Sequence, residues 1–191
     1  MTQHRYILSA AALCLAGAAA ADDFSDAMQS YYHEQIESWV ADPAIVEAIL
    51  AQNATTQRYD QARIDALDAA WQGEVGASAS PTIDPVVNNA LADWLRERIA
   101  ASDGAITELF VMDAVGLNVA ATGVTSDMWQ GDEAKWQETY GAGRGAIHFG
   151  DVELDESSGQ YQGQISVAVV DPATNEVIGA MTVGVNAEKL M

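Results

Sequence analysis

The first half of the chain carries apolar side chains every three or four residues, which is helical spacing. This spacing predicts a helix over 22–40, a second helix that begins at the Asp42-Pro43 cap, and a third that is capped by Thr55 or Thr56. The apolar positions of these helices are Met28, Tyr32, Ile36, Ile45, Val46, Ile49, Leu50, Ile64, Leu67 and Trp71.

A loop with the sequence GEVGASASPT interrupts this helical pattern. Asp84-Pro85 then repeats the cap-and-proline signal, and an i, i+4 apolar stripe predicts one helix from there to Ala101. The stripe consists of Val87, Leu91, Leu95 and Ile99. We therefore divide the chain after the leader into a helical N-terminal region, 22–80, and a second domain, 81–191.

From Thr107 onward the apolar period changes to two, which is typical of strands. The runs TELFVMDA and LNVAATG flank Asp113 and Gly116, which suit a type I turn, so they predict a β-hairpin. The run AIHFGDVEL predicts a third strand, followed by a turn at ESSG. The runs YQGQISVAVVD and EVIGAMTVGVN predict a closing hairpin across 172–175.

The two faces of the closing hairpin differ chemically. One face is aliphatic and is expected to lie under the 84–101 helix, whereas the other is small and polar. The first carries Tyr161, Ile165, Val167, Val169, Val177, Met181, Val183 and Val185, and the second carries Gln162, Gln164, Ser166, Ala168, Ile178, Ala180, Thr182, Gly184 and Asn186. The polar face is either solvated or covers a ligand.

The segment TSDMWQGDEAKWQETY, residues 125–140, can cover that polar face. Ser126 or Asp127 would cap a short helix, and a helix over 133–140 would place its aromatic side chains on one side. Rigid aromatic walls with a few charges form a pocket for a small polar molecule, although each Trp alone is compatible with core packing and the Lys with a surface ion pair. The candidate ligand-binding residues are Trp129, Asp132, Lys135, Trp136, Tyr140, His148, Gln164 and Thr182.

The chain is strongly acidic, with a formal net charge of −20 at pH 7. Such a surface repels phosphate backbones and anionic lipids, so we expect no nucleic-acid partner and no membrane insertion. Acidity of this kind is typical of a solubilising surface. Capture of a cationic ligand would require the acidic groups to be concentrated in a pocket.

The N-terminus has the form of a signal peptide, which we assign to residues 1–21: Arg5 precedes a short apolar run and Ala-x-Ala sites follow. Leu13 is too bulky for a lipidation signal before Cys14, so this cysteine is expected to leave with the peptide. The mature chain would then have no thiol chemistry. We expect a periplasmic or secreted protein.

The sequence does not favour catalysis. It contains no Gly-x-Ser-x-Gly elbow, no phosphate loop and no HExxH motif. The glycine-rich run 141–145 follows no strand. The acidic run 151–155 is followed by Glu156, where an EF-hand loop needs glycine, so we interpret it as a solvated hairpin. We expect no catalytic residue, no metal ligand and no cofactor.

The order of these segments resembles the Cache, or PDC, family of extracytoplasmic sensor domains. Helices, a strand ending MDAVGLNVA, the segment TSDMWQGDEAKW and a hairpin closing with DPATNEVIGAMTVGVN follow one another as in that family. The run IVEAILAQNATTQRYDQARIDALDAAWQGEV is similar to the helical front of stand-alone secreted members. The resemblance implies an α+β, PAS-like fold: a five-stranded antiparallel sheet with a long N-terminal helix and a helical N-terminal extension, and ligand between sheet and cover.

The sequence departs from the family's amino-acid-binding version, which has Arg-x-Trp-Tyr in the cover and an Asp on a late strand. Trp136 matches the Trp, but Ala134 and Gln137 replace the Arg and the Tyr. Thr182 or Asn186 stands near the position of the Asp. The ligand class therefore stays open between an organic acid, an amine and an amino acid.

The resemblance also implies a role in signal transduction. Most such domains are joined to a membrane helix and an output module, whereas this sequence ends at Met191 without one. We therefore expect a separate membrane partner: a sensor kinase, a chemoreceptor or a cyclase. The alternative is a structural or adaptor protein with a PAS-like fold and no ligand.

Overall fold

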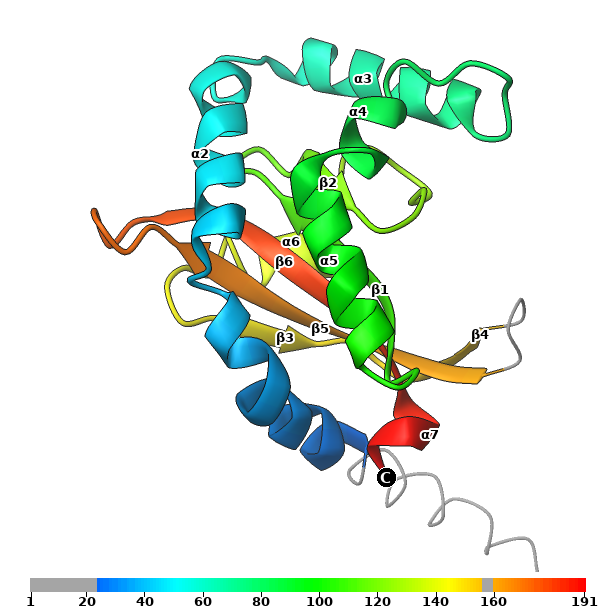
Figure 1. Ribbon diagram of the computed structural model, residues 1–191. Coiled ribbons are helices and arrows are strands. Elements are labelled where there is room, and N and C mark those ends of the chain that lie inside the picture. The colour runs from blue at the N-terminus through cyan, green and yellow to red at the C-terminus, as the bar shows by residue number, and fades with distance from the viewer. Residues whose placement is uncertain (1–23, 156–159) are drawn as a thin grey trace, which may run out of the picture.

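The protein is described from a computed structural model that covers residues 24–155 and 160–191 (Figure 1). The predicted signal peptide and the predicted ESSG turn lie outside these residues. Within the two described ranges, no helix combines the length and the apolar character needed to cross a bilayer.

The chain forms one antiparallel sheet with the strand order β2-β1-β6-β5-β3. Its strands are β1 (Ile106–Met112), β2 (Asn118–Ala121), β3 (Ile147–Phe149), β4 (Glu153–Asp155), β5 (Gln160–Val170) and β6 (Val177–Asn186). β4 pairs with β5 along the edge that β3 also uses, so the sheet is five strands wide. This architecture confirms the predicted α+β class with a five-stranded antiparallel sheet.

The predicted third strand is wrong in one respect, because the run AIHFGDVEL forms two short strands. β3 and β4 are separated by 150–152, where the Gly150 N–H donates to the Gln164 carbonyl oxygen at 2.8 Å. The edge of the sheet is therefore interrupted beside β5.

Most of the helices precede the sheet in the chain. Two short helices come later, α6 between β2 and β3 and α7 after β6. The helical segments are 24–31, a π-helical turn Tyr32–Ile36, a 3-10 turn Glu37–Trp39, α2 (Pro43–Thr56), α3 (Gln61–Glu74), α4 (Asp84–Val87), α5 (Ala90–Ala101), α6 (Ala134–Gln137) and α7 (Ala187–Leu190). The cap predicted for α2 is confirmed, since the Asp42 carboxylate accepts from the Ala44 N–H at 2.9 Å. The cap predicted for the third helix is wrong: α2 continues through Thr56, and Asp60 caps α3.

The single helix predicted over 84–101 is also wrong. α4 ends at Val87, and Asn89 begins α5 by accepting from the Ala92 N–H at 2.8 Å. The Asn89 side chain also donates to the Val119 carbonyl oxygen of β2 at 3.1 Å. An Asn side chain competes for backbone partners in this way, and here the contact with β2 stabilises the break.

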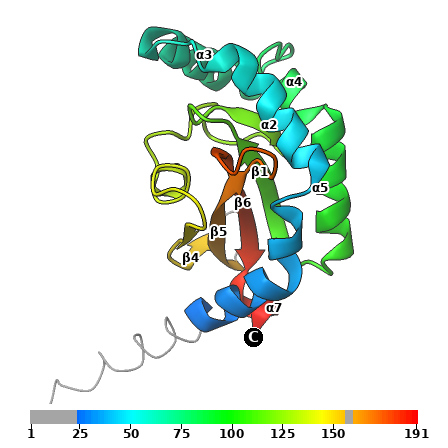
Figure 2. The same ribbon diagram turned by 90° about the vertical axis from the view of Figure 1, so that its left-hand side faces the viewer.

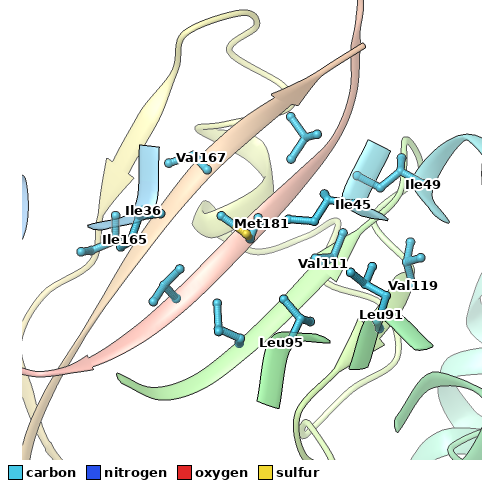
Figure 3. Packing of buried hydrophobic residues seen from close by; sticks show 14 of the residues in the cluster. Ile36, Ile45, Ile49, Leu91, Leu95, Val111, Val119, Ile165, Val167 and Met181 are labelled. Atoms are coloured by element: carbon cyan, nitrogen blue, oxygen red, sulfur yellow. The ribbon is translucent and has the colours of Figure 1, made fainter. Parts of the chain in front are cut away.

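The helices cover one face of the sheet, as Figure 2 shows for α2 and α5. The buried core on this face includes Met28, Ile36, Ile45, Ile49, Leu91, Leu95, Leu109, Val111, Ile165, Val167, Val169, Met181, Val183 and Val185 (Figure 3). Burial of one such side chain contributes about 1.5–3 kcal/mol to folding. The predicted aliphatic face is therefore confirmed along most of β5 and β6, but Tyr161, paired with Leu154 at the outer end of β5, is 45% exposed. The prediction is also wrong at the start of β6, where the register shifts: Ile178, predicted on the polar face, belongs to this core, whereas Val177 does not.

Candidate functional site

The other face of the sheet, which we call the cover face, carries one continuous row of side chains. Ala121, Phe110, Thr182, Ser166 and His148 are successive cross-strand partners from β2 to β3. Cross-strand partners project to the same side. The row therefore brings two of the predicted site residues, Thr182 and His148, onto one face with a phenyl ring and a second hydroxyl.

A buried pair of hydroxyl groups lies at the centre of this row. Ser166 Oγ and Thr182 Oγ1 are 3.0 Å apart, and both residues are fully buried. Two hydroxyl groups carry two protons, and their mutual hydrogen bond uses only one of them. The neighbouring positions on the same face of the sheet are small, namely Ala168, Ala180 and Gly184.

Residues 122–146, which we call the cover segment, lie on this face, opposite α2 and α5 (Figure 2). The segment first runs beside the β1–β2 turn, where the Gln130 N–H donates to the Gly116 carbonyl oxygen at 2.8 Å. Its helix α6 is shorter than predicted, and no helix begins at Ser126 or Asp127. The missing helix at 126–127 is explained by the backbone pairing of Trp129 with Leu117, which holds residues 129–130 extended.

The aromatic side chains of the cover segment contact the β1–β2 turn. The indole N–H of Trp129 donates to the Val115 carbonyl oxygen at 2.8 Å, and that of Trp136 donates to the Asp113 carbonyl oxygen at 3.1 Å. Tyr140 stacks on Trp136 with ring centroids 4.8 Å apart, so these two side chains share one side as predicted. Burial, and next the negative charge of Asp113, raises the pKa of the Tyr140 phenol.

Lys135 is the predicted site residue that reaches over the cover face. Its Nζ lies 5.4 Å from the centre of the Phe110 ring, and its side chain is only 16% exposed. The ammonium group is already paired, with Glu133 Oε2 at 2.8 Å and Gln130 Oε1 at 3.2 Å. The cover segment therefore brings a positive charge and its neutralising carboxylate to the site together.

The remaining predicted residues are spread around these. His148 Nδ1 lies 2.9 Å from Glu138 Oε2, which links β3 to the cover segment. Gln164 donates from Nε2 to Glu108 Oε1 at 2.9 Å. Asp132 is exposed. The structure thus gathers Lys135, His148, Gln164 and Thr182 around the cover face, while the two tryptophans and Tyr140 lie against the turn.

Glu108 is a cover-face residue that the sequence interpretation missed. It lines two cavities, one of about 440 Å³ together with Arg96 and Phe110, and one of about 400 Å³ together with Asp151 and Gln164. Its position two residues before Phe110 in β1 already placed it on the same face. Within the described residues, no group of His, Cys, Asp and Glu side chains is arranged to hold a metal ion.

Comparison with known proteins gives structural neighbours only. No family model and no curated protein matches the sequence. The sensor domain of the histidine kinase DctB from V. cholerae is 17% identical, with a TM-score of 0.48 over 92% of this chain and 56% of that one. The ligand-binding domain of the Pseudomonas aeruginosa chemoreceptor PctC, in complex with GABA, is 13% identical with a TM-score of 0.47, covering 92% of this chain and 60% of that one.

A third neighbour is the ligand-binding domain of the Campylobacter jejuni chemoreceptor Tlp3 in complex with L-valine. It is 13% identical with a TM-score of 0.39, over 87% of this chain and 64% of that one. The chain thus spans 56–64% of the length of these three chains. All three are sensor or ligand-binding domains.

Proposed function

We propose that the protein is an extracytoplasmic sensor protein that binds a small polar metabolite on the cover face and signals through a separate membrane partner. The observation that carries this proposal is the buried Ser166–Thr182 hydroxyl pair, on a face of small residues beneath the cover segment. Burying polar groups costs free energy unless each is hydrogen-bonded; these two hydroxyl groups bond to each other, and an acceptor on the ligand would take the second hydroxyl proton.

The site joins two parts of the fold. Thr182 and Gln164 belong to β6 and β5, whereas Lys135 belongs to helix α6 of the cover segment. A ligand that contacts both parts binds the closed arrangement best and shifts the protein toward it by its differential affinity. A sensor kinase, a chemoreceptor or a cyclase that contacts the closed form would then receive the signal.

The binding part of the proposal is tested by a thermal-shift screen of the exported protein against organic acids, amines, amino acids and purines. A ligand at 100 times its dissociation constant stabilises the folded state by about 2.7 kcal/mol, which raises the melting temperature. Thr182→Val removes the hydroxyl group at constant shape and should reduce the shift. Thr55→Val, at an exposed position of α2, is the matched control.

A silent screen, with protein shown to be folded and free of carried-over ligand, would favour the adaptor role instead. The location is tested separately, because export and cleavage after residue 21 would give a mature N-terminus at residue 22, which N-terminal sequencing of the periplasmic fraction detects. An uncleaved cytosolic protein would refute this part of the proposal.

A further inference from the structure

The Glu108 side chain crosses β6 on the cover face, near the end of that strand. Glu108 on β1 pairs with Gly184 on β6, which in turn pairs with Gln164 on β5. A Cβ atom at Gly184 would collide with Glu108 Cγ and lie 2.8 Å from Thr107 Oγ1, so the missing side chain is what lets Glu108 lie flat across β6. Glu108 Oε1 then accepts from Gln164 Nε2 at 2.9 Å.

Glu108 lines both the 440 Å³ and the 400 Å³ cavity, of which the former also reaches Arg96 of α5, and its carboxylate is not neutralised. No Lys, Arg or His of the described chain forms an ion pair with it. Its partner Gln164 is an uncharged carboxamide, which leaves the negative charge in place. A carboxylate on a half-buried sheet face favours a cation beside it.

The two cations nearest to these cavities are engaged elsewhere. Arg96 lines the 440 Å³ cavity, but its guanidinium donates to the Val87 and Thr122 carbonyl oxygens and to Asp93 Oδ1. Lys135 pairs with Glu133. Neither charge is free to hold the carboxylate of an organic acid.

The 400 Å³ cavity adds further negative charge. Besides Glu108 it is lined by Asp151 and Glu153, and its remaining polar side chains are the carboxamides Gln162 and Gln164. Among the described residues, no basic side chain lines it. The acidic residues of the chain therefore line this cavity as well as the outer surface. In addition, the strong overall negative charge raises the concentration of cations around the protein.

We infer that the ligand of the cover face is an amine, whose ammonium group is held by the Glu108 carboxylate while the rest of the molecule extends into one of the two flanking cavities. This inference rests on the proposed function and narrows its ligand class. An ammonium group offers three donors, and Glu108 Oε2 and Gln164 Oε1 are acceptors on the same row. An organic acid would instead meet an uncompensated carboxylate.

The inference is tested by titration calorimetry of the exported protein with butylamine, 1,4-diaminobutane, tetramethylammonium, butyrate and succinate. We expect at least one of the two primary amines to bind and neither acid to bind. Glu108→Gln keeps the shape and removes the charge, and should weaken amine binding about tenfold or more, as expected for a hydrogen bond to a charged group. Glu47→Gln makes the same change at an exposed position of α2 and should leave binding unchanged.

Gly184→Ala is a second variant, which displaces the Glu108 side chain without changing the charge of the protein. It should weaken amine binding as Glu108→Gln does, and circular dichroism shows whether either variant is folded. Equal weakening by Glu47→Gln would mean that amines respond only to overall charge, which would overturn the inference. Failure of both primary amines to bind would also overturn it.

Failure of this inference and failure of the proposed function give different results. If succinate or butyrate binds and the amines do not, the sensor function stands and the amine assignment is wrong. If no compound of the calorimetric set or of the wider thermal-shift screen binds, both are wrong.

Discussion

Replacement of Asp113 tests how the β1–β2 turn holds the site together. Its carboxylate is fully buried and accepts three hydrogen bonds of 2.9 Å, from the Val115 N–H, the Leu117 N–H and Gln52 Nε2. Its carbonyl oxygen accepts from the Trp136 indole. Asp113→Ala should therefore loosen both the turn and the cover segment.

The loss of unfolding free energy on Asp113→Ala depends on how well water can replace each of the three lost hydrogen bonds. A hydrogen bond to a charged group contributes about 1.5–3 kcal/mol, and a buried donor without a partner costs about 1–3 kcal/mol. Leu117 is only 1% exposed, so its N–H would stay unpaired, whereas the donors of Val115 and Gln52 lie where water can reach them. We expect Asp113→Ala to lower the free energy of unfolding by about 3–4 kcal/mol, a large share of the 5–15 kcal/mol typical of a domain.

Urea denaturation followed by tryptophan fluorescence measures this loss, and a melting temperature lower by about 10 °C is the corresponding thermal result. Asp113→Asn is the matched control, because its amide oxygen can still accept from both turn N–H groups, and it should cost about 1 kcal/mol. An alanine variant within about 0.5 kcal/mol of the parent protein, or an asparagine variant as unstable as the alanine one, would refute the reasoning.

Three further changes have expected outcomes. Trp136→Phe removes the donor to the Asp113 carbonyl and should cost about 1 kcal/mol, with faster amide exchange in the cover segment. Asn53→Ala removes the side-chain partner of the partly buried Ala114 N–H and of the buried Ile178 carbonyl oxygen, and should cost about 2–4 kcal/mol in urea denaturation. Hydrogen bonds, first that from the Ala173 N–H, lower the pKa of the Asp171 carboxyl below its ordinary 3.8. The stability that these bonds contribute is therefore present above pH 3.8 and is lost as the pH falls through the folded-state pKa. Asp171→Asn should make the free energy of unfolding depend less on pH in that acidic range.

Local pattern was sufficient for much of the fold. The period-two alternation over 161–185 predicted most of the side chains that face the helices, because successive residues of a strand point to opposite faces of the sheet. The Asp113–Gly116 turn is equally local, and its Gly116 N–H donates to the Asp113 carbonyl oxygen at 3.1 Å. By contrast, the break at Asn89 depends on the Val119 carbonyl, which is distant in sequence.

The site was less predictable for the same physical reason. The sequence predicted that the tryptophans of the cover segment line a pocket over the polar face, but the partners of their indole groups belong to the β1–β2 turn and follow only from the tertiary arrangement. The Glu108 side chain can lie across β6 because Glu108 pairs with Gly184, and this pairing joins residues far apart in the chain. The alternation within one strand is enough to predict that a face of the sheet is polar. It does not predict which polar side chains on that face contact one another.

Both faces of β6 are buried, but they differ in the chemistry of their side chains. Enlarging or polarising Val183 would damage the core, because it is fully buried beneath helices. On the opposite side, Ala180, Thr182 and Gly184 alternate with the core positions along the same strand. Under the proposed function, exchange of these alternate residues of β6 would change the contacts with the ligand, but Ala180 and Thr182 are themselves fully buried, so the same exchange would also act on the packing of the strand.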